Sequence, residues 1–300
     1  MITLNGRNQS YSFEESKPLA RPGKFSVVYK GVGDDGNYYL IKRLNSIATA
    51  NLFEKEVKHP AFVKTIEQIN DGHLVYLIRP FIEGFPLSEL KKINWFVTEK
   101  NVFVLKSIIQ KICEALTSLH QQELVHLDIR PHNILVGNIN NIDSLFVSII
   151  DLDMVRPFNN NSKIVNFPLL YAAPELMLKS NLIIDHRTDI YALALTIYEI
   201  IFDALPFSVG NPELILHLML NKQLANRNAD HSLMKVLNKA ANKTAFPLPP
   251  SQLNDLEIQN VLLSGMNSRY TSVEEFRMNL LREIKFQPKW YSRLFQFLNR

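Results

Sequence analysis

The stretch from residue 126 to 136, His-Leu-Asp-Ile-Arg-Pro-His-Asn-Ile-Leu-Val, decides the fold of this chain. Within it, Asp128 is followed by a cation two residues later, Arg130, and by an amide five residues later, Asn133. Apolar runs flank these polar residues on both sides, which indicates a rigid loop held between buried segments. Such a loop offers a base, a positive charge and a metal ligand to one small volume.

The loop resembles the catalytic loop of eukaryotic-like protein kinases, usually written H-R-D-L-K-P-x-N. The resemblance implies that Asp128 accepts or orients the proton of the substrate hydroxyl, that Arg130 lies near the γ-phosphate, and that Asn133 binds Mg²⁺. Leu127 stands in place of the motif's arginine, which in such kinases binds a phosphate on the activation segment. We therefore expect activity that does not depend on phosphorylation of that segment.

A second match follows the loop. Residues 149–153, Ile-Ile-Asp-Leu-Asp, resemble the end of a strand followed by D-F-G, so Asp151 is expected to ligate Mg²⁺ and Leu152 to act as an apolar plug. Asp153 replaces the glycine, and we expect it to face outward, with a role as a further metal ligand as the alternative. The long connection from the catalytic loop predicts a small hairpin over residues 137–144.

The first part of the chain has the pattern of β-strands. Residues 23–43 predict strand, turn and strand around Asp34-Asp35-Gly36, and Lys42 ends the second strand. Lys42 resembles the lysine of the V-A-I-K strand, which grips the α- and β-phosphates. The segment before it resembles the glycine-rich loop, but of three expected glycines only Gly23 is present, with Arg21 and Ser26 at the other two positions.

A glutamate is expected to pair with Lys42. Residues 46–58 have helical composition, and Phe-Glu-Lys-Glu-Val at 53–57 resembles the F-x-x-E-V pattern of the kinase helix, which selects Glu56, with Glu54 as second choice. The alternative is that both glutamates belong to a solvated face. The next landmark, His59-Pro60, comes about two helical turns early, at 3.6 residues per turn.

The rest of the chain changes from strands to helices. Residues 62–69 and 73–82 predict two strands around Asp71-Gly72, while 102–120 carries a helical apolar stripe and 189–202 is apolar nearly all round. The fold class predicted is therefore α+β: a bilobal protein-kinase-like fold with a small β-rich N-lobe and a larger α-helical C-lobe. We place the N-lobe at 1–82, the C-lobe at 83–284 and a basic aromatic tail at 285–300.

Three further matches are structural. Residues 171–175 resemble Y-x-A-P-E, 189–194 resemble D-x-W-S-x-G, and 267–271 resemble the R-P-T segment. The resemblance implies that Asp189 fixes the backbone of the catalytic loop and that Arg269 pairs with Glu175. Pro168 takes the place of the threonine whose hydroxyl meets the catalytic aspartate, so the geometry of the substrate site is expected to differ.

Composition limits the partners and the compartment. The formal net charge of +4 is too mild to favour nucleic acid, and the single cysteine, Cys113, excludes an internal disulfide and fits a reducing compartment. The first residues lack the pattern of a signal peptide, and the longest apolar stretch, 191–202, is interrupted by Glu199. We expect a soluble, cytoplasmic protein, with delivery into another cell as an alternative. The tail is expected to dock on the large lobe, with contact to an anionic membrane surface as the alternative.

Together these observations predict an atypical serine/threonine protein kinase that uses ATP and Mg²⁺ and phosphorylates a protein substrate. A nucleotide-binding pseudokinase is the second interpretation, and a kinase of a small molecule or lipid is the third. The predicted catalytic residues are Asp128, Arg130, Lys42 and Glu56, the predicted nucleotide-binding residues are Gly23, Lys42, Phe81, Asn133 and Asp151, and the predicted metal ligands are Asn133 and Asp151.

Overall fold

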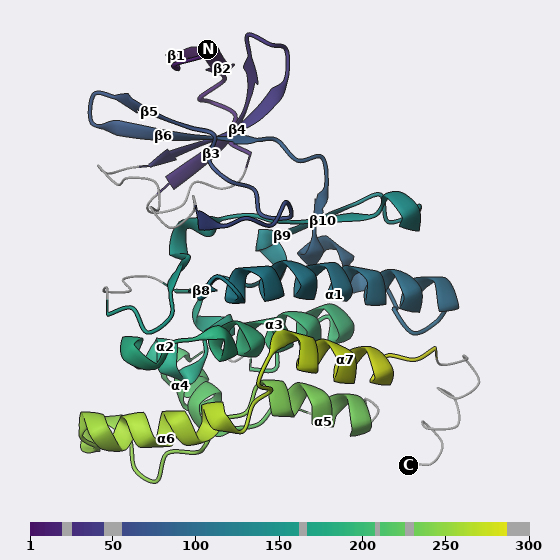
Figure 1. Ribbon diagram of the computed structural model, residues 1–300, viewed down its shortest axis with the longest axis vertical. Helices are drawn as coiled ribbons and strands as arrows, with labels where there is room; N and C mark the ends of the chain where they lie inside the picture. Colours follow the sequence, from purple (N-terminus) through teal and green to yellow (C-terminus); the bar gives the residue numbers. More distant parts are fainter. Residues whose placement is uncertain (20–25, 45–55, 162–166, 208–210, 226–230, 287–300) are drawn as a thin grey trace.

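A computed structural model describes residues 1–19, 26–44, 56–161, 167–207, 211–225 and 231–286. Figure 1 shows a sheet formed by the beginning of the chain at one end of the molecule and most of the helices at the other. The predicted fold class, with a β-rich N-terminal part and a helical C-terminal part, is confirmed.

The N-terminal part is one antiparallel sheet of six strands in the order β1-β2-β3-β4-β6-β5. Its strands are β1 (Ile2–Asn5), β2 (Ser10–Phe13), β3 (Ser26–Gly33), β4 (Tyr38–Leu44), β5 (Glu67–Asp71) and β6 (Leu74–Pro80). The hairpins predicted around Gly36 and Gly72 are both present, and the two glycines have φ of 78° and 59°, in the left-handed region that such turns favour. Sequence reasoning missed β1 and β2.

The strand predicted from Phe62 begins later, at Glu67. Phe62 instead makes an isolated parallel bridge to Ile149, whose amide donates to the carbonyl of Ala61. Phe62 is therefore buried in the apolar core of the helical part of the chain rather than in the sheet. An apolar run alone does not distinguish these two kinds of burial, which explains the error.

The sheet curls so that its first and last strands approach each other. The amide of Arg7, after β1, and the hydroxyl of Tyr11 on β2 both donate to the carboxylate of Glu67 on β5. The concave face encloses an apolar core that includes Tyr29, Ile41 and eight other buried residues. Because side chains alternate along a strand, the opposite face carries the residues in between.

That opposite face contains the charged side chains of the candidate site. The register pairs Val28 with Lys42, Lys42 with Leu77, and Leu40 with Arg79. Directly opposed residues of an antiparallel pair point to the same side, so Lys42 and Arg79 are diagonal neighbours on one face.

Seven α-helices lie in the described C-terminal part: α1 (Glu99–His120), α2 (Pro174–Met177), α3 (His186–Phe202), α4 (Pro212–Asn221), α5 (His231–Ala240), α6 (Asp255–Asn267) and α7 (Val273–Glu283). Thr98 caps α1 by accepting from the amide of Asn101, and Asp185 caps α3 by accepting from the amide of Arg187. Helix α3 is buried along almost its whole length, as its apolar sequence predicts. None of the helices in the described part of the chain combines the length and the apolar character that a bilayer crossing requires.

Two small sheets hold the loops that carry the chemistry. One has the order β10-β9-β7 and consists of β7 (Phe85–Pro86), β9 (Ile134–Gly137) and β10 (Phe146–Ile149); the other pairs β8 (Leu124–Val125) with β11 (Arg156–Pro157). The hairpin predicted over 137–144 is present as the connection between β9 and β10. The catalytic loop thus lies between β8 and β9, and the segment with Asp151 lies between β10 and β11.

Candidate active site

Helix α3 supports the catalytic loop through the side chain of Asp189. Asp189 is fully buried, and its carboxylate accepts the amides of His126 and Leu127 at 2.8 and 2.9 Å and contacts Nε2 of His120 at 2.8 Å. Burial alone would raise the pKa of Asp189, but the hydrogen bond and charge of His120 with the other donors outweigh it and lower the pKa. The predicted role of Asp189 in fixing this backbone is confirmed.

Leu127 has an unusual backbone. Its φ is 66°, a left-handed conformation that costs a bulky residue about 1–3 kcal/mol, and its side chain is buried in the apolar core of the helical part. The hydrogen bond that the Leu127 amide donates to the Asp189 carboxylate helps to hold this conformation. The position that carries an arginine in the kinase motif is thus filled by an apolar side chain that cannot bind a phosphate.

Asp128 lies in a buried, polar environment. Its Oδ2 accepts from Nδ2 of Asn133 at 2.7 Å, and its Oδ1 lies 3.1 Å from Nε of Arg130, within ion-pair distance but not aligned for a hydrogen bond. Oδ1 is therefore a buried acceptor that has no hydrogen-bond donor among the described residues. Burial raises the pKa of Asp128 to about 7, against the opposing charge of Arg130. A carboxylate with such a pKa can exchange a proton near neutral pH.

The next chain segment is tied directly to the loop. The amide of Ile150 donates to the carbonyl of Asn133 at 2.9 Å, which places Asp151 beside the catalytic loop. Asp151 also has a left-handed backbone, with φ of 65°. Both hydrogen bonds of the Asn133 side chain use Nδ2, so its Oδ1, the atom that can ligate a metal, stays uncommitted within the described residues.

Lys42 reaches this segment from the sheet. Its Nζ lies 2.8 Å from Oδ1 of Asp151 and 2.7 Å from Oδ2 of Asp153, and its side chain is only 9% exposed. Burial by itself disfavours the ammonium, but the two carboxylates outweigh it and raise the pKa of Lys42. Burial likewise opposes ionisation of Asp151, yet the charges of Lys42 and Arg79 hold its pKa below its usual range. Both groups are charged at neutral pH.

The side chain of Asp153 is 38% exposed, in keeping with the prediction that it faces outward, but its carboxylate is paired with two cations. Besides Lys42, its carboxylate contacts Arg79, whose Nη2 donates to Oδ1 at 3.0 Å. The alternative, that Asp153 is a further metal ligand, stays a prediction. The side chain of Arg79 is only 4% exposed, and a cation buried to that degree needs an anion such as the Asp153 carboxylate beside it.

Sequence reasoning missed Arg79. The signal was present: an arginine follows the apolar run Val75-Tyr-Leu-Ile78 in a predicted strand, and an acid replaces a glycine at Asp153. A buried cation needs a counter-charge, and the two unusual residues have opposite charges. Only the fold shows that they meet, because 74 residues separate them.

The expected pairing of Glu56 with Lys42 is not found in the described residues. Glu56 is exposed, and the acids that contact Lys42 are Asp151 and Asp153. Glu54, Arg21 and Gly23 lie outside the described residues, as does most of the tail from 287 onward.

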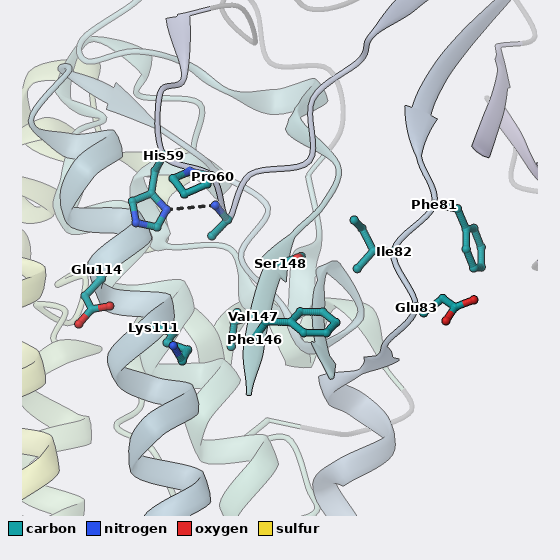
Figure 2. A pocket seen from close by; sticks show the side chains of 11 residues that line it. His59, Pro60, Phe81, Ile82, Glu83, Lys111, Glu114, Phe146, Val147 and Ser148 are labelled. Atoms are coloured by element: carbon teal, nitrogen blue, oxygen red, sulfur yellow. Dashed lines mark hydrogen bonds between the residues drawn. The ribbon is translucent and has the colours of Figure 1, made fainter. Parts of the chain in front are cut away.

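Phe81 lies in the linker that follows β6. Its ring packs edge-on to Tyr38, and Nζ of Lys30 lies 4.3 Å from its centroid. Phe81 and the two residues after it also line a pocket of about 540 Å³, together with the 59–61 turn, α1 and β10 (Figure 2). In that view the ring points away from the labelled β10 side chains. This pocket contains none of the other predicted site residues, so a nucleotide contact of Phe81 stays a prediction.

The structure confirms one further prediction about the C-terminal part and places the residue of another. Arg269 forms the expected ion pair with Glu175, and both side chains are buried. Pro168 precedes a 3-10 helix, Leu169–Tyr171, and the hydroxyl of Tyr171 donates to Glu199 on α3.

The cluster fits a magnesium nucleotide in its chemistry. Mg²⁺ usually keeps several waters and takes only one or two protein carboxylates along with phosphate oxygens. Asp151 and the uncommitted Oδ1 of Asn133 are hard oxygen donors that would suit Mg²⁺, and Lys42 would offer a cation to phosphate. The buried Oδ1 of Asp128, which has no hydrogen-bond donor among the described residues, is suited to accept a hydroxyl proton.

Comparisons with known proteins agree with this geometry. A family model described as the protein kinase domain matches residues 18–281. The chain is similar to serine/threonine-protein kinase PknD of Chlamydia abortus, with 25% identity over 78% of this chain and 26% of the relative. It is also similar to PknD of Chlamydia trachomatis serovar L2b, with 25% identity over 88% and 29%, and to serine/threonine-protein kinase ULK3 of Rattus norvegicus, with 26% identity over 62% and 41%. The chain thus spans well under half the length of these relatives.

Proposed function

The chain belongs to the protein kinase family, and from that membership we propose that it transfers the γ-phosphate of ATP to serine or threonine hydroxyls of a protein substrate. Protein kinases as a family use ATP and Mg²⁺. The observation that carries the proposal is the contact of Lys42 with Asp151 at 2.8 Å, beside the catalytic loop. In that loop the buried Oδ1 of Asp128 receives no hydrogen bond from the described residues. The preference for serine and threonine is supported by the names of the relatives and by Pro131 after Arg130.

The roles of the residues follow from their contacts. Asp128 orients the substrate hydroxyl through Oδ1 and takes up its proton, which its pKa of about 7 allows near neutral pH. Asn133 holds Asp128 in place through Nδ2 and offers Oδ1 to a metal. Arg130 lies close enough to Asp128 to share its environment and to face an incoming phosphate.

The remaining roles belong to the strand lysine and to Asp151. Lys42 is held charged by its carboxylate partners and is the cation for the phosphate oxygens. Asp151, charged at neutral pH, is the carboxylate ligand for Mg²⁺. When bound, ATP would supply the phosphoryl group and Mg²⁺ would neutralise the charge that develops on its transfer.

The test is transfer of label from γ-labelled ATP with Mg²⁺ to the protein itself and to general acceptor proteins such as casein. We expect labelled serine or threonine after hydrolysis of the product. Asp128→Ala and Asp151→Ala should each lower the rate by at least about 10²-fold, the range for loss of a general base. Asp143→Asn, an exposed acid in the β9–β10 connection, is the matched control and should leave the rate unchanged.

One observation favours a second function. Asp153 and Arg79 add an ion pair to the cluster, and Asp153 also contacts Lys42. The charges of the four side chains are therefore balanced within the protein, without a bound nucleotide. A pseudokinase that binds nucleotide without transferring phosphate would fit such a cluster. A rise in melting temperature with Mg²⁺ and ATP, but no label on any protein, would establish this second function in place of the first.

A further inference from the structure

We infer that Asp153 and Arg79 together form the positioning pair for Lys42, in the role that the family resemblance gives to a helix glutamate such as Glu56. The inference rests on the proposed function for its catalytic meaning, and on the contacts alone for its structural part. Asp153 contacts Lys42 at 2.7 Å with one carboxylate oxygen and Arg79 at 3.0 Å with the other. It bridges two cations that lie on one face of the sheet.

The bridge is anchored at its far end. Nε of Arg79 donates to Oγ1 of Thr65 at 3.1 Å, while Nη2 holds Asp153. The chain of contacts therefore runs from Thr65 through Arg79 and Asp153 to Lys42. Arg79 comes from the interior of the sheet, where its register opposite Leu40 fixes its direction. A guanidinium held at both ends presents its donors in a fixed geometry.

The charges of the cluster are balanced. Lys42 and Arg79 are buried cations on neighbouring strands, and Asp151 and Asp153 are the carboxylates between them. The charge of Arg79 disfavours the charged Lys42 nearby, so the second cation requires the second acid. Removing Asp153 takes a counter-charge at 3.0 Å from the buried Arg79, and removing Arg79 leaves the cluster with one more acid than cation, whereas removing both restores the balance. Asp153 and Arg79 are therefore energetically coupled.

Asp153 is the carboxylate that stays with Lys42. Asp151 is the expected metal ligand, so its carboxylate has a second task, and a lysine whose side chain is 9% exposed needs a permanent anion. Glu56 is exposed and makes no contact with Lys42 in the described residues. Asp153 can be this permanent anion, because its Oδ2 contacts Lys42 and its Oδ1 contacts Arg79.

A double-mutant cycle tests the structural part without nucleotide. Arg79→Met and Asp153→Gly, alone and together, are compared by thermal unfolding. Each single substitution is expected to lower Tm by about 3 °C or more, and the double substitution to lower it no further than the worse single one. Additive losses in the double variant would overturn the coupling. Asp143→Asn is the control for loss of an acid and should leave Tm unchanged.

Binding of ADP and of adenosine tests the positioning of Lys42. Because Lys42 is expected to contact phosphate, Asp153→Asn should weaken the binding of ADP with Mg²⁺ by about 10-fold, which is about 1.4 kcal/mol. The same substitution should leave the binding of adenosine unchanged. It should also weaken ADP binding more than Glu56→Gln does. Stronger ADP binding by Asp153→Asn would overturn the inference, since Asp153 would then compete with phosphate for Lys42. So would an equal loss for adenosine, which would indicate a general structural defect.

The two proposals fail in different ways. If the unaltered protein binds ADP but transfers no phosphate, the proposed function fails while the unfolding cycle and the ADP comparison still decide the inference. If the protein transfers phosphate but the cycle shows additivity, the inference fails alone. A protein that binds neither ADP nor ATP would overturn both the function and the positioning role of Asp153.

Discussion

The guanidinium of Arg269 holds the carboxylate of Glu175 by two hydrogen bonds, Nη1 to Oε1 at 2.7 Å and Nη2 to Oε2 at 3.0 Å, across 94 residues of sequence. Thr188 at the start of α3 donates to the same carboxylate. The pair thus joins three distant parts of the C-terminal region: α2, the start of α3 and the turn after α6.

The first prediction concerns this pair. Arg269→Met should lower the free energy of unfolding by about 3–5 kcal/mol, because it leaves a fully buried carboxylate without its counter-charge. Arg277→Met, which breaks a partly exposed pair with Glu274 on α7, should cost about 1 kcal/mol or less. Chemical denaturation of both variants checks the contrast, and equal losses would contradict it.

The second prediction concerns control by phosphorylation. Residues 151–175 contain two hydroxyl side chains, Ser162 and Tyr171, and the hydroxyl of Tyr171 is bonded to Glu199. With Leu127 in place of an arginine, no cation of the catalytic loop at that position can bind a phosphate there. Ser162→Ala and phosphatase treatment should each leave the rate of phosphate transfer within about twofold of the untreated protein. A large drop after either treatment would show that another cation reads a phosphate on this segment.

The third prediction concerns pH. Burial raises the pKa of Asp128 to about 7, against about 3.9 in an unfolded chain, so the folded protein binds more protons between these values. The contribution of this group to stability is complete below about pH 4 and is lost as the pH rises through about 7. Asp128→Asn removes this titration. Its Tm should therefore rise relative to the unaltered protein between pH 4 and pH 8.

The same titration predicts an activity profile. If Asp128 takes up the hydroxyl proton, kcat/KM should rise with pH and level off above about 7. Asp143→Asn should keep both the activity profile and the Tm profile of the unaltered protein. A Tm difference for Asp128→Asn that stays constant with pH would show that Asp128 has an ordinary pKa.

The fourth prediction concerns the support of the catalytic loop. Asp189→Asn replaces one acceptor oxygen of the side chain by an NH₂ group, which cannot accept a hydrogen bond. The backbone N–H of either His126 or Leu127 then loses its acceptor. We expect a lower Tm and a lower kcat with little change in ATP affinity, because the sheet that carries Lys42 is not altered. Unchanged kcat would show that the loop keeps its geometry without α3.

Much of the site could be predicted from local sequence. Asp128, Arg130 and Asn133 lie within one loop of six residues, so their spacing alone brings them together, and Asn133 does bond Asp128. The hairpin before Asp151 was equally local, because β9 and β10 are neighbours in the chain. The buried helix α3 followed from its continuous apolar sequence.

Other features could not be predicted in this way. Strands β1 and β2 are short, and their burial depends on the curl of a sheet that brings β1 towards β5. The pairing of Glu56 with Lys42, expected from the motif, is not found in the described residues, where Asp151 and Asp153 contact Lys42 instead. A motif can select a glutamate by its spacing, but it does not show which acid finally lies within 3 Å of an ammonium group.

The sequence by itself determined the family, the catalytic loop and the loss of the arginine at Leu127, since these depend on residues adjacent in the chain. The tertiary structure decided the charge pairing. Lys42, Arg79 and Asp153 come from two strands and a distant loop, 74 and 111 residues apart, and their contacts depend on strand register and on the path of the connecting chain. Ion pairs of this kind need a few ångströms of accuracy, because the interaction falls with distance and with exposure to water. Only the folded chain places the charges that closely.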